Sequence, residues 1–90
     1  MKIEFDPDKR NRTLIERGLD YTRAVEIFLG KHLTNEDSRK DYLEHRFQTI
    51  GWLDGRLVVV VWTPRGSSRR IISMRKANER EIARIGSRLD

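Results

Sequence analysis

The sequence predicts an α+β fold, a small and mostly antiparallel sheet with helices packed on one face and the other face partly open. Helix-like segments with capping residues occupy the first third of the 90-residue chain. Strand-like segments follow close together, and one carries four consecutive valines at 58–61, which favours a central strand covered on both faces. A helix-like segment ends the chain. The predicted order is therefore one strand, two helices, four strands and one helix.

The first strand is expected at residues 2–5 and the first helix at residues 7 to about 17. Asp6 can cap this helix, because its carboxylate can accept hydrogen bonds from backbone N–H groups of the first turn, and Pro7 suits that turn. Gly18 provides the stop, since glycine readily adopts the left-handed conformation that commonly ends a helix. The chain is therefore expected to leave the first helix at this glycine.

A second short helix is expected within residues 19–30, capped by Asp20 and ended by Gly30. Three of its side chains are expected to face the core: Ala24, Val25 and Phe28. Residues 31–41 begin like a strand and continue as a polar, exposed turn.

Three further strands are expected at residues 42–53, 56–63 and 69–74. Asp54 and Gly55 separate the first two, and this pair of residues is preferred in the two-residue turn of a β-hairpin. These two strands are therefore expected to pair with each other.

The last helix is expected at residues 78–89. Asn78, with Glu81 three residues later, forms a variant of the capping box that marks a helix N-terminus. The helix carries an apolar stripe that can pack on the sheet: Ile82, Ile85 and Leu89.

The turn at Asp54 and Gly55 also sets the register of the hairpin, because a two-residue loop pairs Leu53 with Arg56. The side expected to pack under the helices then carries two cross-strand pairs: Phe47 with Trp62, and Thr49 with Val60. The opposite side carries two others: Glu44 with Arg65, and Arg46 with Thr63.

The turn that follows Thr63 decides where the next arginine points. A loop with an even number of residues sends Arg70, together with Ile72 and Met74, to the side of Thr63 and Arg65, whereas a β-bulge would reverse this. Glu44 would then lie among arginines on an open sheet surface. Cross-strand Glu–Arg pairs are also ordinary stabilising contacts on exposed sheets, so this arrangement alone does not establish a site.

Positive charge is concentrated at the end of the sequence. Residues 1–64 contain 11 Lys or Arg and 11 Asp or Glu, whereas residues 65–90 contain 8 Lys or Arg and 3 Asp or Glu. The formal net charge of +5 therefore arises entirely from the second segment. A nucleic acid partner, an acidic protein partner or a simple solvated basic surface would each explain this distribution.

Composition excludes several classes of protein. The chain has no cysteine, so it can form neither a disulfide framework nor a Cys-ligated metal site. No apolar run approaches the roughly 18 residues that a membrane-spanning helix needs, and the N-terminus lacks the apolar region of a signal peptide. We therefore expect a single cytoplasmic domain over residues 1–90, without metal, cofactor or membrane association.

Several motifs occur in a familiar order. They are FDPDK at 5–9, LDYTRAVEIF at 19–28, E-x-R-x-x-x-x-G starting at Glu44 and Arg46, GRLVVVVWTPRG at 55–66 and RIISMRKANERE at 70–81. In this order they resemble the BrnT toxins of bacterial type II toxin–antitoxin systems, small ribonucleases with a fold similar to that of RelE-type toxins. The chain departs from the family pattern at three places: Arg17 replaces the usual His, Thr13 replaces an Asn, and Ile85 or Gly86 takes the place of a Tyr.

The resemblance implies an activity and a partner. Proteins of this family act as metal-independent endoribonucleases that arrest translation. A cognate ribbon-helix-helix antitoxin, similar to BrnA, neutralises them through an extension that covers the basic surface of the toxin. Operator DNA is bound only through that antitoxin.

Cleavage of RNA by its own 2′-OH requires a base, cations around the phosphorane and an acid for the leaving 5′-oxygen. Arginines match phosphate oxygens with forked hydrogen bonds, so three are expected to bind phosphate and stabilise the transition state: Arg65, Arg70 and Arg75. Glu44 is expected to act as the base or to orient an arginine. Flanking phosphates are expected to contact three further cations: Lys9, Arg46 and Lys76.

Two other classes of function remain open. One is a non-catalytic nucleic-acid-binding or regulatory module that retains the basic face, which the departures at Arg17 and near the C-terminus would favour. The other is an interaction protein whose basic surface serves only a protein partner.

Overall fold

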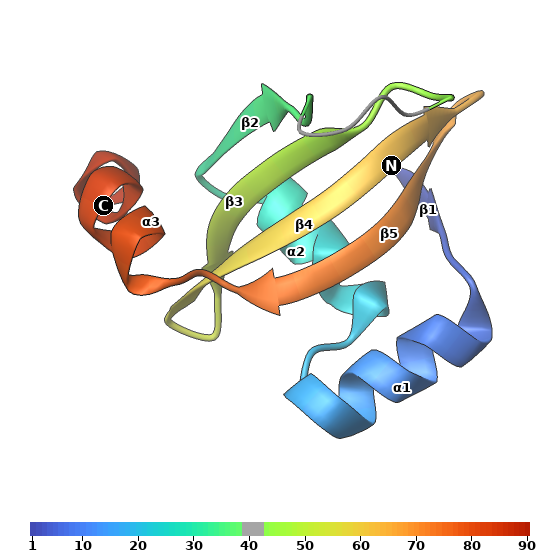
Figure 1. Cartoon of the computed structure of the whole chain (residues 1–90), viewed down its shortest axis with the longest axis horizontal. Helices are drawn as coiled ribbons and strands as arrows, with labels where there is room; N and C mark the ends of the chain where they lie inside the picture. Colours follow the sequence, from blue (N-terminus) through green and yellow to red (C-terminus); the bar gives the residue numbers. More distant parts are fainter. Residues whose placement is uncertain (39–42) are drawn as a thin grey trace.

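The computed structural model describes residues 1–38 and 43–90, which form a five-stranded sheet of order β1-β5-β4-β3-β2 and its helices (Figure 1). β1 pairs with β5 in parallel, and the other neighbours are antiparallel. The α+β class and the mostly antiparallel sheet are thus confirmed. The elements are β1 (Lys2–Glu4), α1 (Pro7–Arg17), the 3₁₀ helix η1 (Tyr21–Arg23), α2 (Ala24–Leu29), β2 (His32–Glu36), β3 (Phe47–Leu53), β4 (Arg56–Arg65), β5 (Ser68–Lys76), α3 (Glu79–Ile85) and the 3₁₀ helix η2 (Gly86–Leu89).

The helix ends follow the capping residues of the sequence. The Asp6 carboxylate accepts a hydrogen bond of 2.9 Å from the backbone N–H of Asp8 at the start of α1. Gly18 ends that helix with a φ of 70°, in the left-handed region that favours glycine. Asn78 and Glu81 form a complete capping box at the start of α3.

The second predicted helix is divided in two. Asp20 caps the 3₁₀ turn η1, and α2 follows directly. Within α2 the inward face follows the i, i+3, i+4 spacing of a helix and consists of Ala24, Ile27 and Phe28. Ile27 is therefore fully buried, whereas Val25, which was expected to face the core, is only half-buried.

The strand predicted at residues 42–53 begins only at Phe47. Residues 39–42, including the predicted start of this strand, lie outside the described residues. Residues 43–46 are described but are not part of the ladder. The carbonyl of Arg46 accepts a hydrogen bond of 2.7 Å from the Asp37 N–H, and the carbonyl of His45 accepts one of 2.6 Å from the Thr63 hydroxyl. The bond from Thr63 joins this segment to β4 in place of a regular ladder, and the bond from Asp37 joins it to the residue that follows β2.

The first face of the sheet packs against η1 and α2. Its core includes Val58, Val60 and Met74 of the sheet, all fully buried. Trp62 lies at one end of this core, with its ring 5.0 Å from the Phe47 ring and 5.6 Å from the Phe28 ring between centroids. The predicted pairs Phe47–Trp62 and Thr49–Val60 are confirmed, so the hairpin register follows the turn at Asp54 and Gly55.

The second face is covered at one end only, which corrects the prediction that the helices pack on one face. Ile85 and Leu89, from α3 and η2, pack against Ile50, Leu57 and Val59. Side chains alternate along a strand, so every second valine of β4 faces this side and needs cover. In Figure 1, α2 lies behind the sheet and α3 lies at the left.

A β-bulge in β5 changes which side chains share a face. The partners of Trp62 and Val61 on β5 are Ile71 and Ser73, so one extra residue is accommodated between them. Met74 therefore points into the first core instead of lying beside Arg70, as was expected. The same bulge turns Arg75, the partner of Val59, onto the second face.

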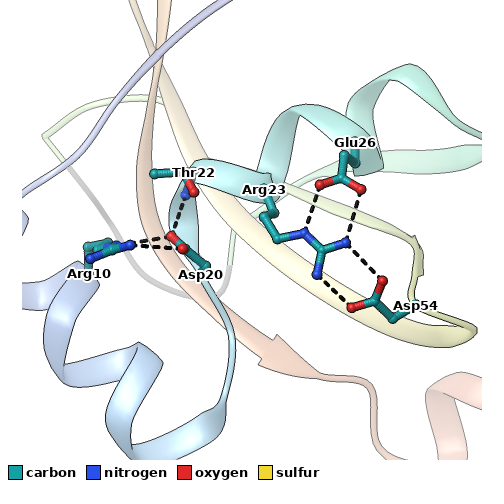
Figure 2. Close-up of polar contacts among 6 residues, drawn as sticks. All are labelled: Arg10, Asp20, Thr22, Arg23, Glu26 and Asp54. Carbon is teal, nitrogen blue, oxygen red and sulfur yellow. Dashed lines mark hydrogen bonds and ion pairs between the residues drawn. The ribbon is translucent and has the colours of Figure 1, made fainter.

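Two groups of ion pairs tie α1 and the hairpin tip to the rest of the fold (Figure 2). The Arg10 guanidinium of α1 donates two hydrogen bonds to Asp20, at 3.0 and 2.8 Å. Arg23 donates to Asp54 at the hairpin tip, at 2.6 and 2.8 Å, and also to Glu26. The positions of α1 and the turn are therefore linked to η1.

The Arg10–Asp20 pair predicts a loss of stability in acid. Hydrogen bonding to Arg10 lowers the pKa of Asp20 from 3.8 to about 2. Because the folded-state pKa is below the unfolded one, the pair stabilises the fold above pH ~4, and this is lost as the pH falls toward 2. Urea unfolding should show Asp20→Asn to be about 1 kcal/mol less stable than wild type at pH 6, with little difference near pH 2. An equal difference at both pH values would contradict this origin.

No helix of the described residues is long and apolar enough to span a membrane.

Candidate functional site

The end of the second face that α3 leaves open carries charged side chains from three strands. Arg70 of β5 lies opposite Thr63 of β4 on one side and opposite Glu4 of β1 on the other. In the next row, Ser68 lies between Arg65 and Lys2. We call this area the basic sheet surface, formed by Lys2, Glu4, Glu44, Arg46, Arg65 and Arg70.

Glu44 lies between two arginines of this surface. Its carboxylate is 3.6 Å from Nε of Arg46 and 3.9 Å from Nη2 of Arg65, and its side chain is 36% exposed. Both distances exceed a good hydrogen bond, so these contacts hold the groups together by charge. Arg65 is 52% exposed and its guanidinium forms no hydrogen bond with the described residues, so its N–H donors can reach an incoming anion.

The sequence register placed Glu44 across from Arg65, and these side chains do meet, although not as a ladder pair. Thr63 is buried, and its hydroxyl holds the carbonyl of His45 between Glu44 and Arg46. The His45 ring points to Glu36 on β2, with Nδ1 3.2 Å from its carboxylate oxygen. The main-chain anchor at Thr63 thus positions Glu44 and Arg46 over the open face.

Replacing Thr63 by valine should loosen this anchor without changing the volume of the side chain. We expect a loss of about 1 kcal/mol in the free energy of unfolding, because one buried hydrogen bond is removed. RNA affinity should fall further than this loss of stability explains, since Glu44 and Arg46 lose their fixed position. Urea unfolding and oligoribonucleotide binding measure the two effects. A variant that loses stability but binds RNA like wild type would contradict the positioning role.

Arg70 and Arg75 lie at different places on the second face. Arg70 shares the basic sheet surface and forms an ion pair with Glu4 at 3.7 Å. Arg75 donates two hydrogen bonds to Glu81 of α3, at 2.8 and 2.9 Å, which lower the pKa of Glu81. The partner of Arg75 on β4 is four residues from the partner of Arg70, about 13 Å along the strand. Arg75 therefore does not converge with Arg65 and Arg70 on one phosphate.

The two predicted lysines line separate cavities beside α1. Lys9 lines a cavity of about 280 Å³ between α1 and β5, together with Arg12 and Ser73. Lys76 lines a cavity of about 550 Å³ near the hairpin tip. Lys9 is the third residue of α1, near the end of the helix that adjoins β1, whereas Lys76 lies at the far end of β5 from Arg70.

Sequence reasoning missed Lys2 and Glu4 as parts of the basic sheet surface. Their place depends on the parallel pairing of β1 with β5, between segments far apart in the chain. One signal in the sequence could have indicated their place. Apolar Ile3, which packs into the first core, alternates with its charged neighbours, so these neighbours point to the opposite face.

Arg17 and Thr13, which differ from the residues usual in the family, both form hydrogen bonds in the structure. β1 pairs only with residues 68–70, so it leaves the remaining edge of β5 facing α1. There Arg17 donates a hydrogen bond of 2.8 Å to the carbonyl of Met74, and the hydroxyl of Tyr21 donates one of 3.3 Å to that of Ile72. Thr13 donates in turn to the Tyr21 hydroxyl. Both residues thus help close this edge.

Within residues 1–38 and 43–90, no three His, Asp or Glu side chains are grouped so as to hold a metal ion.

Comparison with known proteins gives one family whose model matches the chain. A family model described as "Ribonuclease toxin, BrnT, of type II toxin-antitoxin system" matches residues 5–81. The matched range includes Glu44, Arg46, Arg65 and Arg70 of the basic sheet surface. A search of curated proteins finds no match.

Proposed function

The chain belongs to the BrnT family of ribonuclease toxins of type II toxin–antitoxin systems, and we propose that it is a metal-independent endoribonuclease whose active site is the basic sheet surface. One observation carries the choice of site: an accessible carboxylate, Glu44, lies between Arg46 and Arg65, with Arg70 on the same open face. Guanidinium groups around an exposed acid suit a reaction in which a phosphate gains negative charge.

In the proposed reaction, Glu44 takes the proton from the 2′-OH of a ribose. The 2′-oxygen attacks the adjacent phosphorus, the bond to the 5′-oxygen breaks, and a 2′,3′-cyclic phosphate forms. The leaving 5′-oxygen takes a proton from water. Arg65 and Arg70 bind the phosphate oxygens and stabilise the charge that develops on them. Glu44→Gln keeps the shape of the side chain but removes the base, so activity in this variant would show that Glu44 only orients Arg65.

We propose that neighbouring phosphates contact Arg46 and Lys9. β5 supports this route, because Arg70 on the basic sheet surface is followed two and three residues later by Ile72 and Ser73, which line the cavity of Lys9. A single RNA strand could therefore pass from the sheet surface to α1 along a positively charged path. Arg75 and Lys76 lie farther along β5, beyond this path.

The proposed cellular role follows from the family. Cleavage of RNA in the cytoplasm by this single-domain toxin would inhibit translation. A cognate ribbon-helix-helix antitoxin, similar to BrnA, would neutralise the toxin and bring the complex to operator DNA.

Expression without an antitoxin tests the proposal. We expect growth arrest and RNA fragments with cyclic phosphate ends in wild type, and neither in Arg70→Ala. Arg88→Ala is a matched control, because Arg88 is exposed and lies away from the basic sheet surface. Purified wild type should cleave in the presence of EDTA. A folded, harmless protein that still binds RNA would instead support a non-catalytic binding module.

A further inference from the structure

We propose that the cavity beside the hairpin tip binds an acidic segment of the antitoxin that carries an aliphatic side chain. The cavity measures about 550 Å³ and lies between α1, the hairpin tip and the end of β5. This inference rests on the proposed function for the source of the segment. The chemistry of the segment is argued from the cavity itself.

The floor of the cavity is aliphatic. It is formed by Leu14, Leu19, Leu53 and Val58. Leu14 is 36% exposed, and the next residue, Ile15, is 85% exposed on the same helix. An aliphatic side chain placed here would remove apolar surface from water, which is favourable.

The rim of the cavity carries positive charge that the fold does not neutralise. The side chains of Arg56 and Lys76 form no hydrogen bond or ion pair with any described residue, and Arg17 bonds only to a backbone carbonyl among them. The two acids of the lining are already occupied: Asp20 by Arg10, and Asp54 by Arg23 (Figure 2). Carboxylates of a ligand would therefore meet cations rather than competing acids.

The ion pairs of Figure 2 also hold the walls in place before any ligand arrives. Arg23 joins η1 to the hairpin tip, and Arg10 joins α1 to the loop before η1. A preformed cavity avoids part of the entropy cost of ordering a binding site. Its volume lies in the range of ligand-binding pockets, about 300–1,000 Å³.

A peptide fits this cavity better than a nucleotide. Single-stranded nucleic acids are held by stacking their bases on flat side chains, usually aromatic ones. No aromatic side chain occurs among the described residues that line the cavity. Aliphatic contacts combined with unneutralised cations instead match a leucine flanked by Asp or Glu.

The position of the cavity separates this binding from the proposed catalytic groups. Arg56 begins β4 and Arg65 ends it, so the hairpin-tip end of the cavity lies about 30 Å along the strand from the proposed catalytic arginine. A segment in the cavity would anchor the antitoxin, while another part of it covers the basic sheet surface. A short peptide confined to the cavity should leave Glu44, Arg65 and Arg70 free.

The test uses a fluorescein-labelled peptide, Glu-Glu-Leu-Asp-Glu-Leu-Glu, and fluorescence anisotropy at low salt. We expect saturable binding to wild type that weakens about tenfold or more in the double variant Arg56→Glu/Lys76→Glu. Leu14→Ser, or a peptide with Ser in place of Leu, should also weaken it. The double variant Arg80→Glu/Arg88→Glu changes the net charge equally at exposed sites outside the cavity and should bind the peptide like wild type.

Several results would overturn the inference. Equal weakening in the control double variant would show that net charge alone attracts the peptide. Equal binding of the Ser peptide would show that the apolar floor is not used. Direct binding of a labelled 2′-O-methyl oligoribonucleotide that is lost in Arg56→Glu/Lys76→Glu but kept in Arg80→Glu/Arg88→Glu would assign the cavity to RNA.

A second arm uses the antitoxin co-expressed with the toxin. Arg56→Glu/Leu14→Ser should cleave RNA like wild type but resist neutralisation, since the anchor is lost. Full neutralisation of this variant would overturn the inference while leaving the ribonuclease proposal intact. Absence of cleavage in wild type, with peptide binding as expected, would instead overturn the ribonuclease proposal alone.

Discussion

Replacement of Arg65 by alanine is expected to lower the rate of RNA cleavage by about 100- to 1,000-fold. Arg65 is half-exposed beside Glu44, and its guanidinium forms no hydrogen bond with the described residues, so its donors can bind the phosphate in the transition state. The fold should be unaffected, because the ion pair with Glu44 that is lost is long and exposed. Single-turnover cleavage and thermal unfolding would measure the two effects.

Two matched variants make this result specific. Arg65→Lys keeps the charge but loses the forked donors, so it should restore only part of the rate. Arg80→Ala removes an exposed arginine of α3 and should cleave like wild type. If Arg65→Ala and Arg80→Ala had similar rates, Arg65 would have no role in catalysis.

Replacement of Trp62 by alanine is expected to destabilise the protein by about 3–5 kcal/mol. Trp62 is 7% exposed, packs against Phe28 and Phe47, and donates a hydrogen bond of 2.8 Å to the Thr49 hydroxyl. The Arg69 guanidinium also lies over its ring, at 4.3 Å from the centroid. A domain stability is commonly about 5–15 kcal/mol, so this single change should bring the protein close to unfolding.

Trp52→Ala provides the control, because it removes the same kind of side chain from a position that is 37% exposed. Its indole donates to the carbonyl of Leu89, so a smaller loss of about 1 kcal/mol is expected. Urea unfolding would compare the two variants. Equal losses would contradict the role of Trp62 in anchoring its end of the core.

The sequence predicted the part of the fold that depends on local signals. The turn at Asp54 and Gly55 determines the hairpin register through a conformation that few residue pairs adopt, and Asp54 indeed has a positive φ of 54°. From that register, Glu44 and Arg65 were predicted to lie close together, and they do, although residues 43–46 do not pair with β4 as a strand. The caps of α1 and α3 were also predicted, because each depends on residues close together in the sequence.

Other parts depend on contacts that no local pattern records. The bulge at Ile72 has no distinct residue signature, so Met74 was placed on the wrong face. Ile82 belongs to the apolar stripe of α3 but is 47% exposed, because Ile85 and Leu89 suffice to cover the second core. The parallel partner of β1 joins the two ends of the chain and could not be read from either end alone.

The candidate site was predictable where it lies on the hairpin and less so elsewhere. Arg70 reached the expected face because the turn at Gly66 and Ser67 has an even number of residues. Arg75 was expected near the end of the strand, but its pairing with Glu81 depends on where α3 packs. Tertiary packing therefore divides a run of basic residues that looks continuous in the sequence.

Mapping the RNA contact surface tests the central proposal most directly. Titration of the isotopically labelled protein with a 2′-O-methyl oligoribonucleotide, which cannot be cleaved, would be followed by the backbone amide signals. The proposed site predicts the largest changes at residues 44–46, 63–65 and 68–70, with the hairpin tip and α3 unchanged. Changes confined to α3 or to the hairpin tip, with Glu44 and Arg65 unaffected, would contradict it.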